Sequence, residues 1–260
     1  MLILGLQLAL SVRRESQTWD EGNHIYAGYM SWRRADFGLN PEHPPLVKLL
    51  ATAPLLPLPL KAPEPQDRYF KEAAFLGGKD FLYRNDADMI LFRTRMAAAT
   101  LTLLLALLVF VATREMFGTG AAFIALALLA FEPNLLAHGA LVTTDAGISC
   151  FMLATIYAFY RFAKAPSVWR VALVGVSAGL ALAVKHTGIF VFPMLFVLAV
   201  CEVLRHRRAA KGDGTTATKE SGKQALKFAA ALAAIVVIAV AVLWSFYGFR
   251  YRARPDGLQL

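Results

Sequence analysis

Long apolar blocks constrain this chain more than any other feature of its sequence. Six blocks are long enough to span or nearly span a bilayer, at roughly 94–113, 119–137, 146–163, 170–186, 187–204 and 226–248. A helix that crosses the hydrocarbon core needs about 20 apolar residues, and its backbone must satisfy its own hydrogen bonds there. The pattern therefore predicts an all-α integral membrane protein built as a multi-span bundle of transmembrane helices.

Composition and charge placement agree with a membrane protein. The 260 residues are 57% hydrophobic and 17% charged, whereas about a quarter of the residues in a soluble domain are charged. Cys150 and Cys201 both lie in apolar blocks without metal or redox spacing, so we interpret them as small hydrophobic residues. The net charge of +9 does not indicate nucleic acid, because the basic residues gather in short loops between apolar blocks.

Those basic loops predict the orientation of the bundle. One short loop is flanked by basic residues, and a second holds a basic cluster, whereas the loops between them hold few. Loops rich in Lys and Arg stay on the cytoplasmic side. The residues concerned are Arg161, Lys164 and Arg170 in the first loop, and Arg205, Arg207, Arg208, Lys211, Lys219, Lys223 and Lys227 in the second. We therefore expect the 13–93 and 132–145 loops on the outer face, although the tail residues Arg250, Arg252 and Arg254 argue mildly against this.

We expect one membrane domain over residues 1–260. Block 1–12 is too short to span a bilayer, and we interpret it as a truncated first span, with a signal-peptide core as the alternative. Residues 13–93 form the outer loop, 94–204 the bundle and 226–248 the last span. Residues 205–225 are polar and without periodicity, which predicts a flexible cytoplasmic linker.

The outer loop opens with a polar and aromatic stretch. Thr18-Trp19-Asp20-Glu21 fits a capping box, with Thr18 as the N-cap and Glu21 at the third helical position. The helix that follows carries an apolar and aromatic stripe, which is typical of a helix that lies in the membrane interface. The stripe consists of Ile25, Tyr26, Tyr29, Met30 and Arg33. Helix capping alone can explain Glu21, and a first-turn acid gains a little from the helix dipole, so Asp20 also has a structural explanation.

A second polar element follows about twenty residues later. His43-Pro44-Pro45 interrupts any helix, because each proline fixes φ and keeps the preceding residue extended. Residues 46–50 can then begin a short helix that projects Lys48 from its first turns. Alone, this sequence predicts a turn.

The acidic pair followed by His-Pro-Pro-Leu resembles the first outer loop of GT-C glycosyltransferases that use a lipid-linked sugar donor. The protein O-mannosyltransferase (family 39) group and its bacterial relatives are the nearest resemblance. It implies that the Asp-Glu pair, Asp20 and Glu21, is catalytic, with Asp20 as the general base, and that His43 and Lys48 lie beside it near the donor phosphate. It also implies a polyprenyl-phosphate sugar donor and a protein, lipid or glycan acceptor, with a bacterial inner membrane as the expected location.

The implied reaction needs few groups. An acceptor hydroxyl attacks the anomeric carbon of the sugar, a carboxylate takes the hydroxyl proton, and cations stabilise the departing phosphate. A single displacement inverts the anomeric centre, so the paired carboxylates of retaining hydrolysis are not required. Nothing in the sequence demands a metal or a nucleotide cofactor.

A second polar cluster is expected on the same face. The 131–145 segment contains Glu132, His138 and Asp145, and the 185–188 turn contains Lys185 and His186. In the resembled family an aspartate precedes a transmembrane helix, and the stretch GLALAVKHTGIFVFP is similar to a helix pair of these enzymes. We therefore add His138, Asp145 and Lys185 as candidate donor-binding residues. Ordinary capping by Asp145 and a snorkelling Lys185 are the structural alternatives.

Two other classes of function remain open from the sequence. A transporter places ionisable groups near the membrane midplane, often in repeated halves, whereas here we find no repeats and expect no buried charge deep in a span. A non-catalytic fragment or scaffold is the third possibility. We favour a membrane glycosyltransferase that moves mannose or a similar sugar to an acceptor hydroxyl outside the cytoplasm.

Overall fold

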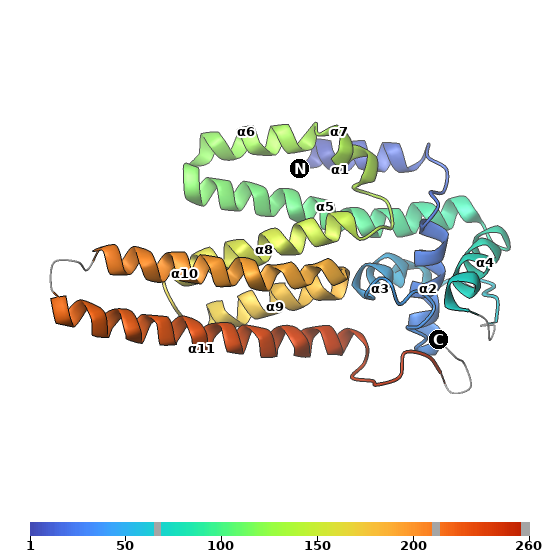
Figure 1. Cartoon of the computed structure of the whole chain (residues 1–260). Helices are drawn as coiled ribbons and strands as arrows, with labels where there is room; N and C mark the ends of the chain where they lie inside the picture. The colour runs from blue at the N-terminus through green and yellow to red at the C-terminus, as the bar shows by residue number, and fades with distance from the viewer. Residues whose placement is uncertain (65–68, 210–213, 256–260) are drawn as a thin grey trace.

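The computed structural model describes residues 1–64, 69–209 and 214–255, and within these ranges it is all-helical (Figure 1). The first half of the chain forms α1 (Leu2–Val12), α2 (Glu21–Arg34), α3 (Leu46–Thr52), the 3-10 turn η1 (Ala53–Leu55), α4 (Phe70–Tyr83) and α5 (Ala87–Phe117). The second half forms α6 (Thr119–Ala130), α7 (Pro133–His138), α8 (Asp145–Lys164), α9 (Val168–Val184), η2 (His186–Phe190), α10 (Val191–Ala209) and α11 (Gly214–Phe246). The expectation of an all-α fold is confirmed for the part of the chain described.

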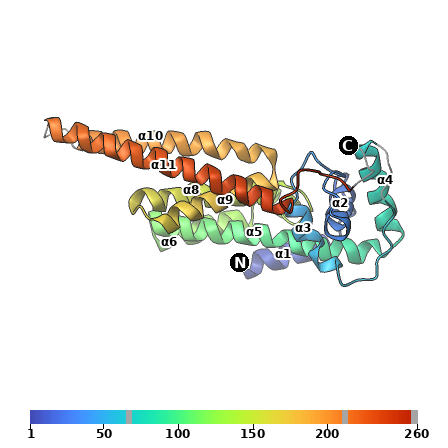
Figure 2. The same cartoon turned by 90° about the horizontal axis from the view of Figure 1, so that it is seen from below.

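The molecule has two distinct ends. Helices α5, α8, α9, α10 and α11 run side by side, and both Figure 1 and Figure 2 show α2, α3 and α4 gathered at one end of them. We call α2, α3, η1 and α4 the outer-loop layer. The α5–α6 turn at Gly118, the α8–α9 turn and the facing ends of α10 and α11 lie at the other end (Figure 1). The tertiary structure thus separates the predicted outer loop from the predicted basic loops.

Four helices are long and apolar enough to cross a membrane: Ala87–Phe117, Asp145–Lys164, His186–Arg208 and Gly222–Phe246. They confirm the predicted blocks 94–113, 146–163, 187–204 and 226–248. Of the other two blocks, one is shorter than predicted and one is displaced. In 119–137, α6 ends at Ala130, because Pro133 begins a new helix whose N-cap is Glu132. The twelve residues of α6 extend only about 18 Å, less than the roughly 30 Å of a hydrocarbon core. For 170–186, α9 begins two residues earlier, at Val168, and ends at Val184, where the backbone of Lys185 is extended.

The predicted linker differs from the structure. Helix α10 continues to Ala209 and α11 begins at Gly214, so most of 205–225 is helical and only 210–213 lies outside the described residues. Once a long apolar helix exists, each added residue gains a hydrogen bond without a new nucleation cost. Ala, Lys and Glu are also good helix formers. The polarity of residues 205–225 therefore did not predict where α10 ends and α11 begins.

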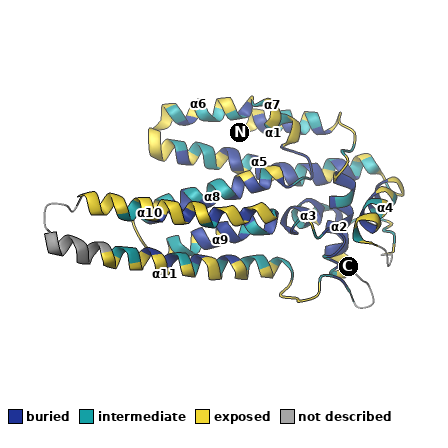
Figure 3. Cartoon of the chain, in the orientation of Figure 1, coloured by how far each residue is buried: buried dark blue, intermediate teal, exposed yellow. Residues whose placement is uncertain are grey.

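Three apolar clusters hold the elements together. One joins α8, α9, α10 and α11; a second joins the outer-loop layer to α5; a third packs α1 against α5, α6 and α7. Figure 3 shows exposed residues along α6, α10 and α11, whereas α2 and α3 are mostly buried. Exposed apolar faces of this kind suit contact with lipid tails.

The aromatic stripe of α2 is buried within the protein. Ile25, Tyr26, Tyr29 and Met30 are all buried in the second cluster, and the Tyr29 ring lies 4.9 Å from that of Phe81 in α4. The prediction that this stripe faces the membrane interface is therefore wrong, because α3, α4 and α5 cover it. The apolar face of a single helix does not by itself show whether lipid or protein covers it.

The C-terminal segment returns to the outer-loop layer. The Phe37 backbone N–H donates to the Ala253 carbonyl at 2.7 Å, and the Arg254 guanidinium donates to the Asp36 carboxylate at 3.2–3.3 Å. Both charged side chains are buried. The Asp36 carboxylate of the outer loop thus neutralises the charge of Arg254. Arg254 therefore no longer argues against the predicted orientation.

The first prediction concerns the close packing of α4 on α2. A Cβ added at Gly78 would lie 2.6 Å from the backbone of Gly22, a distance that forces the helices apart. We expect Gly78→Ala to lower the thermal unfolding temperature in detergent. Gly120→Ala is the matched control, because a Cβ at Gly120 meets nothing within 4 Å and alanine favours a helix. Equal unfolding temperatures for the two variants would contradict this packing.

Candidate active site

Asp20 is an exposed carboxylate at the start of α2. It occupies the N-cap position but its side chain makes no capping hydrogen bond to the described first turn. Its backbone carbonyl instead accepts the His24 N–H at 3.0 Å. The carboxylate is therefore available to a bound molecule at the outer-loop layer.

Glu21, its neighbour, is fully buried in an ion pair. The Arg95 guanidinium donates to both carboxylate oxygens, from Nε at 2.8 Å and from Nη2 at 2.6 Å, and both side chains have no exposed surface. The Val142 backbone N–H adds a third hydrogen bond at 3.2 Å. Burial raises the pKa of Glu21. The hydrogen bond and positive charge of Arg95, together with the hydrogen bonds from the Thr18 and Val142 backbone N–H groups, outweigh this effect, so the pKa lies below its usual value. Glu21 is thus a buried anion that organises the site.

The predicted capping box is only partly correct. Helix α2 begins at Glu21 itself, so Glu21 is not the third helical residue and Thr18 is not the N-cap. The Thr18 N–H and hydroxyl nevertheless both donate to Glu21 Oε2, at 2.9 and 3.0 Å. Arg95 also binds this carboxylate in the core, and a turn at Trp19 and Asp20 separates Thr18 from the helix.

His43 lies against a second histidine that the sequence did not single out. The ring centroids of His43 and His24 are 4.8 Å apart, and both Nδ1 atoms are buried without a partner among the described residues. Burial lowers the pKa of His24 to about 3, with Lys48 and His43 contributing. Burial and the charges of Lys48 and Lys185 also lower the pKa of His43, against an opposing effect of Asp20. Both imidazoles are therefore neutral at neutral pH.

Lys48 is a buried positioning residue in this structure. Its Nζ donates to the Asn40 carbonyl at 2.7 Å, and the side chain is buried. Burial lowers its pKa to about 7, which the negative charge of Asp36 partly offsets. The residue braces the turn that carries His43, and its contact with a donor phosphate stays a prediction.

Lys185 and Asp145 form an ion pair at the edge of the site. Lys185 Nζ donates to Asp145 Oδ1 at 2.8 Å, and both side chains are partly exposed. Asp145 is the first residue of α8, whose N-cap is Thr144. Next to Lys185, the His186 ring nitrogen lies 3.2 Å from the Pro41 carbonyl oxygen, which connects the end of α9 to the turn before His43. The structure therefore brings Lys185 and Asp145 to the edge of the outer-loop layer.

His138 lines a separate cavity together with Asp145. This cavity has a volume of about 340 Å³ and is also lined by Glu132 and Ser149. Glu132 has a clear structural role, because its carboxylate accepts the Leu135 N–H as the N-cap of α7. His138 and Asp145 thus share one cavity.

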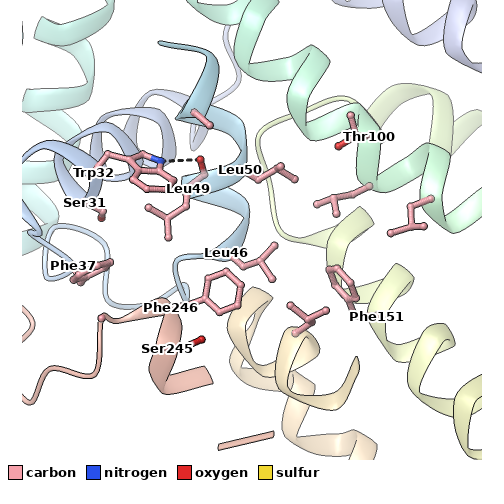
Figure 4. Close-up of a pocket in the computed structure, with 15 residues that line it drawn as sticks. Ser31, Trp32, Phe37, Leu46, Leu49, Leu50, Thr100, Phe151, Ser245 and Phe246 are labelled. Carbon is pink, nitrogen blue, oxygen red and sulfur yellow. Dashed lines mark hydrogen bonds between the residues drawn. The ribbon is translucent and has the colours of Figure 1, made fainter. Parts of the chain in front are cut away.

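A larger apolar cavity lies beneath α3. It has a volume of about 760 Å³, and its lining comes from α2, α3, α5, α8, α9 and the end of α11. Figure 4 shows Leu46 and Leu50 of α3 facing Phe151 of α8 and Phe246 of α11 across it. The cavity is wide enough and apolar enough to hold part of a hydrocarbon chain.

Sequence reasoning missed several residues that shape this site. Arg95 is fully buried in α5, near the outer end of the predicted block 94–113 and not deep in it. An ionisable residue near the start of an apolar block was the available signal. His24, Asn40 and Asp36 gave no comparable signal, because only the folded turn brings them to His43, Lys48 and Arg254.

The fold and the site define a multi-pass helical membrane protein with ionisable groups gathered at one end of its bundle. A family model described as dolichyl-phosphate-mannose-protein mannosyltransferase matches residues 89–244. The match covers more than half of the chain, so the chain belongs to this family, and the resemblance is confirmed. Membership implies a mannosyltransferase that depends on a lipid-phosphate-linked sugar. No curated protein matches the chain.

The matched region contains some of the candidate residues and not others. His138, Asp145 and Lys185 lie within 89–244, whereas Asp20 and His43 precede it. Arg95, at the start of the matched region, binds Glu21 outside it. The contact shows how the outer loop is attached to the family domain.

The Glu21–Arg95 pair generates a stability prediction. Removing one partner of a buried ion pair leaves an uncompensated charge and typically costs about 3–5 kcal/mol. We expect Arg95→Met to lower the thermal unfolding temperature markedly, and the double variant Glu21→Gln/Arg95→Met to recover part of the loss. Arg93→Met, at an exposed position two residues away, is the control. An Arg95→Met protein that unfolds like Arg93→Met would contradict the assignment.

Lys48 generates a prediction about pH. Its pKa is about 7 in the folded protein and about 10.4 in an unfolded chain, so the unfolded state binds more protons between these values. Stability should therefore rise as pH increases from 7 to 9.5, by at most about 1.4 kcal/mol per pH unit from this group. Unfolding temperatures measured over this range should rise less steeply in Lys48→Met. The exposed Lys61→Met control should keep the parent slope, and a parent slope in Lys48→Met would refute the prediction.

Proposed function

We propose that the protein transfers mannose or a related sugar from a polyprenyl-phosphate donor to an acceptor hydroxyl on the non-cytoplasmic face, with inversion of the anomeric centre. Family membership supports the donor class. The observation that carries the proposal is the exposed carboxylate of Asp20, whose charge raises the pKa of His43 whereas the charge of Lys185 lowers it. The contact of the His186 ring with the Pro41 carbonyl also joins the turn that carries Lys185 to the segment before His43. A base and a cation thus occur within one small region.

Asp20 is the general base in this proposal. The acceptor oxygen forms a bond to the anomeric carbon while the bond from that carbon to the phosphate oxygen breaks. The acceptor proton passes to the Asp20 carboxylate, and the polyprenyl phosphate leaves with the bonding electrons. Glu21 is assigned a positioning role, since its carboxylate is bound to Arg95 and is closed to solvent.

Lys185 is the proposed contact of the leaving phosphate, and Asp145 orients it through the 2.8 Å ion pair. A preorganised cation stabilises the negative charge that develops on the phosphate. Phe151 and Leu180 line the apolar cavity within two helical turns of Asp145 and Lys185 along α8 and α9. This placement supports a donor whose phosphate lies at Lys185 and whose lipid chain descends into the cavity.

The remaining candidates support these groups. Neutral His43 can donate a hydrogen bond to the sugar or accept one from it. Lys48 holds the turn that carries His43. His138 lies with Asp145 along one cavity and is assigned to the donor side of the site.

Charge placement supports the proposed sidedness. Arg161, Lys164 and Arg170 flank the α8–α9 turn, at the end of the bundle opposite the outer-loop layer (Figure 1). The positive-inside rule puts that end in the cytoplasm. The reaction centre then faces the other side.

The decisive test is sugar transfer by Asp20→Asn. We expect membranes that contain the parent chain to transfer labelled mannose from polyprenyl phosphate mannose, and Asp20→Asn to lose about a hundredfold or more of that rate. Asparagine keeps the size of the side chain and can still occupy an N-cap position. Asp88→Asn is the matched control, because Asp88 is an exposed acid in the first turn of α5.

Each outcome has a defined meaning. Loss of transfer in Asp20→Asn with normal folding and a normal Asp88→Asn rate supports Asp20 as the base. Equal rates in the parent and Asp20→Asn would remove Asp20 from the chemistry. A folded parent without transfer from any polyprenyl-phosphate sugar would refute the proposed function.

A further inference from the structure

A groove lies between α10 and α11, toward the end of the bundle opposite the outer-loop layer, and the proposed reaction does not use it. It has a volume of about 280 Å³. Both helices contribute residues at spacings of three and four, so each helix presents one face to the groove. These residues include Phe196, Val200, Leu204 and Arg207 of α10 and Ala225 and Ala229 of α11.

The groove is apolar and partly open to the surroundings of the protein. Phe228, which also lines it, is 5% exposed, because its ring packs edge-to-face on Phe162 of α8 with centroids 5.7 Å apart. By contrast, Phe196 is 61% exposed and Leu204 is 45% exposed. Large apolar side chains with this exposure suit contact with a hydrocarbon chain and not with water.

The length of the groove matches the depth of one membrane leaflet. Phe196 and Arg207 are eleven residues apart on α10, which corresponds to about 16 Å along a helix axis. Half of a hydrocarbon core is about 15 Å thick. Arg207 lies one residue before the end of the candidate span His186–Arg208. The groove therefore extends from the membrane surface at Arg207 to about the midplane, which is the depth that one acyl chain occupies.

The surface end of the groove carries an excess of positive charge. Residues 202–227 contain seven Lys and Arg against three Asp and Glu, and Glu202 is bound by Arg205. Arg207 lines the groove, and Arg208, Lys223 and Lys227 near it in the sequence are exposed. Lys and Arg at a membrane surface attract anionic lipids. An apolar groove with a basic end thus complements a molecule with a hydrocarbon chain and a negatively charged head group.

We propose that this groove binds an anionic phospholipid, with one acyl chain between α10 and α11 and the phosphodiester at Arg207. Basic pockets between transmembrane helices on the cytoplasmic side recognise anionic head groups, and the positive-inside rule puts this end of the bundle in the cytoplasm. A zwitterionic lipid has no net charge to complement the basic end. A polyprenyl chain is several times longer than an acyl chain and would extend beyond the groove. The bound lipid stabilises the packing of α10 against α11.

The test is lipid binding to the full chain, purified in detergent, stripped of lipid and followed by native mass spectrometry. We expect one phosphatidylglycerol to bind at least about fivefold more tightly than a phosphatidylcholine with the same acyl chains, since one Lys or Arg near an anionic lipid is worth about that factor. Arg207→Gln should weaken phosphatidylglycerol binding about fivefold and leave phosphatidylcholine binding unchanged. Arg114→Gln is the matched control, because Arg114 is an exposed arginine in the last turn of α5. It should keep the parent affinity.

A second pair of variants tests the groove itself. Ala229→Leu fills the space between the helices and should weaken phosphatidylglycerol binding at least as much as Arg207→Gln. Ala230→Leu is its control, because Ala230 is exposed on the same helix and lies outside the groove lining. It should bind phosphatidylglycerol like the parent chain.

The outcomes that would overturn the inference are specific. Equal affinities for the two lipids, or equal effects of Arg207→Gln and Arg114→Gln, would overturn the choice of an anionic head group. Equal effects of Ala229→Leu and Ala230→Leu would overturn the groove as the binding site. Tighter binding of polyprenyl phosphate than of phosphatidylglycerol would overturn the choice of a phospholipid. None of these measurements depends on sugar transfer, so the inference stands or falls independently of the proposed function.

Discussion

The buried ion pair between Glu21 and Arg95 is the interaction on which the outer-loop layer depends. Arg95 donates to the Glu21 carboxylate and also to the backbone carbonyls of Glu15 and Ser16, each at 2.8 Å. Glu21 in turn accepts from Val142 in the loop before α8. Taking two charges out of water is costly, and only a fully hydrogen-bonded arrangement of this kind offsets the cost. One pair thereby joins α2 to α5, to the segment after α1 and to the second outer loop, and it fixes the position of Asp20 next to it.

The two lysines differ in burial, and they therefore have different roles in the proposed site. Lys48 is enclosed by protein, and burial lowers its pKa. It braces the turn around Asn40, and its charge adds to the effect of burial in lowering the pKa of His24 and His43. Lys185 is partly exposed and paired with Asp145, so its ammonium group can face an incoming phosphate. In the proposed reaction the base and the cation are thus exposed to solvent, whereas His24 is buried and the pKa of both imidazoles is lowered mainly by burial.

The proposed donor has two binding regions of different character. The apolar cavity beneath α3 suits a lipid chain, and Lys185, partly exposed and paired with Asp145, suits its phosphate. Gly22 and Gly78 allow the close approach of α2 and α4 next to Asp20. In the proposed reaction a lipid-linked donor therefore meets its acceptor at the boundary between the bundle and its outer-loop layer.

The sequence by itself determined the helical membrane class, four of the six predicted spans and the short helix after His43-Pro44-Pro45, because hydropathy and proline act locally. It also placed His138, Asp145 and Lys185 in the loops that the structure brings to one region. Only the tertiary structure decided that the aromatic stripe of α2 is covered by protein, that Glu21 binds Arg95, and that Lys48 is buried with His24 and His43 nearby. These features depend on contacts between residues far apart in the chain, and the energies of burial and ion pairing are set by those contacts.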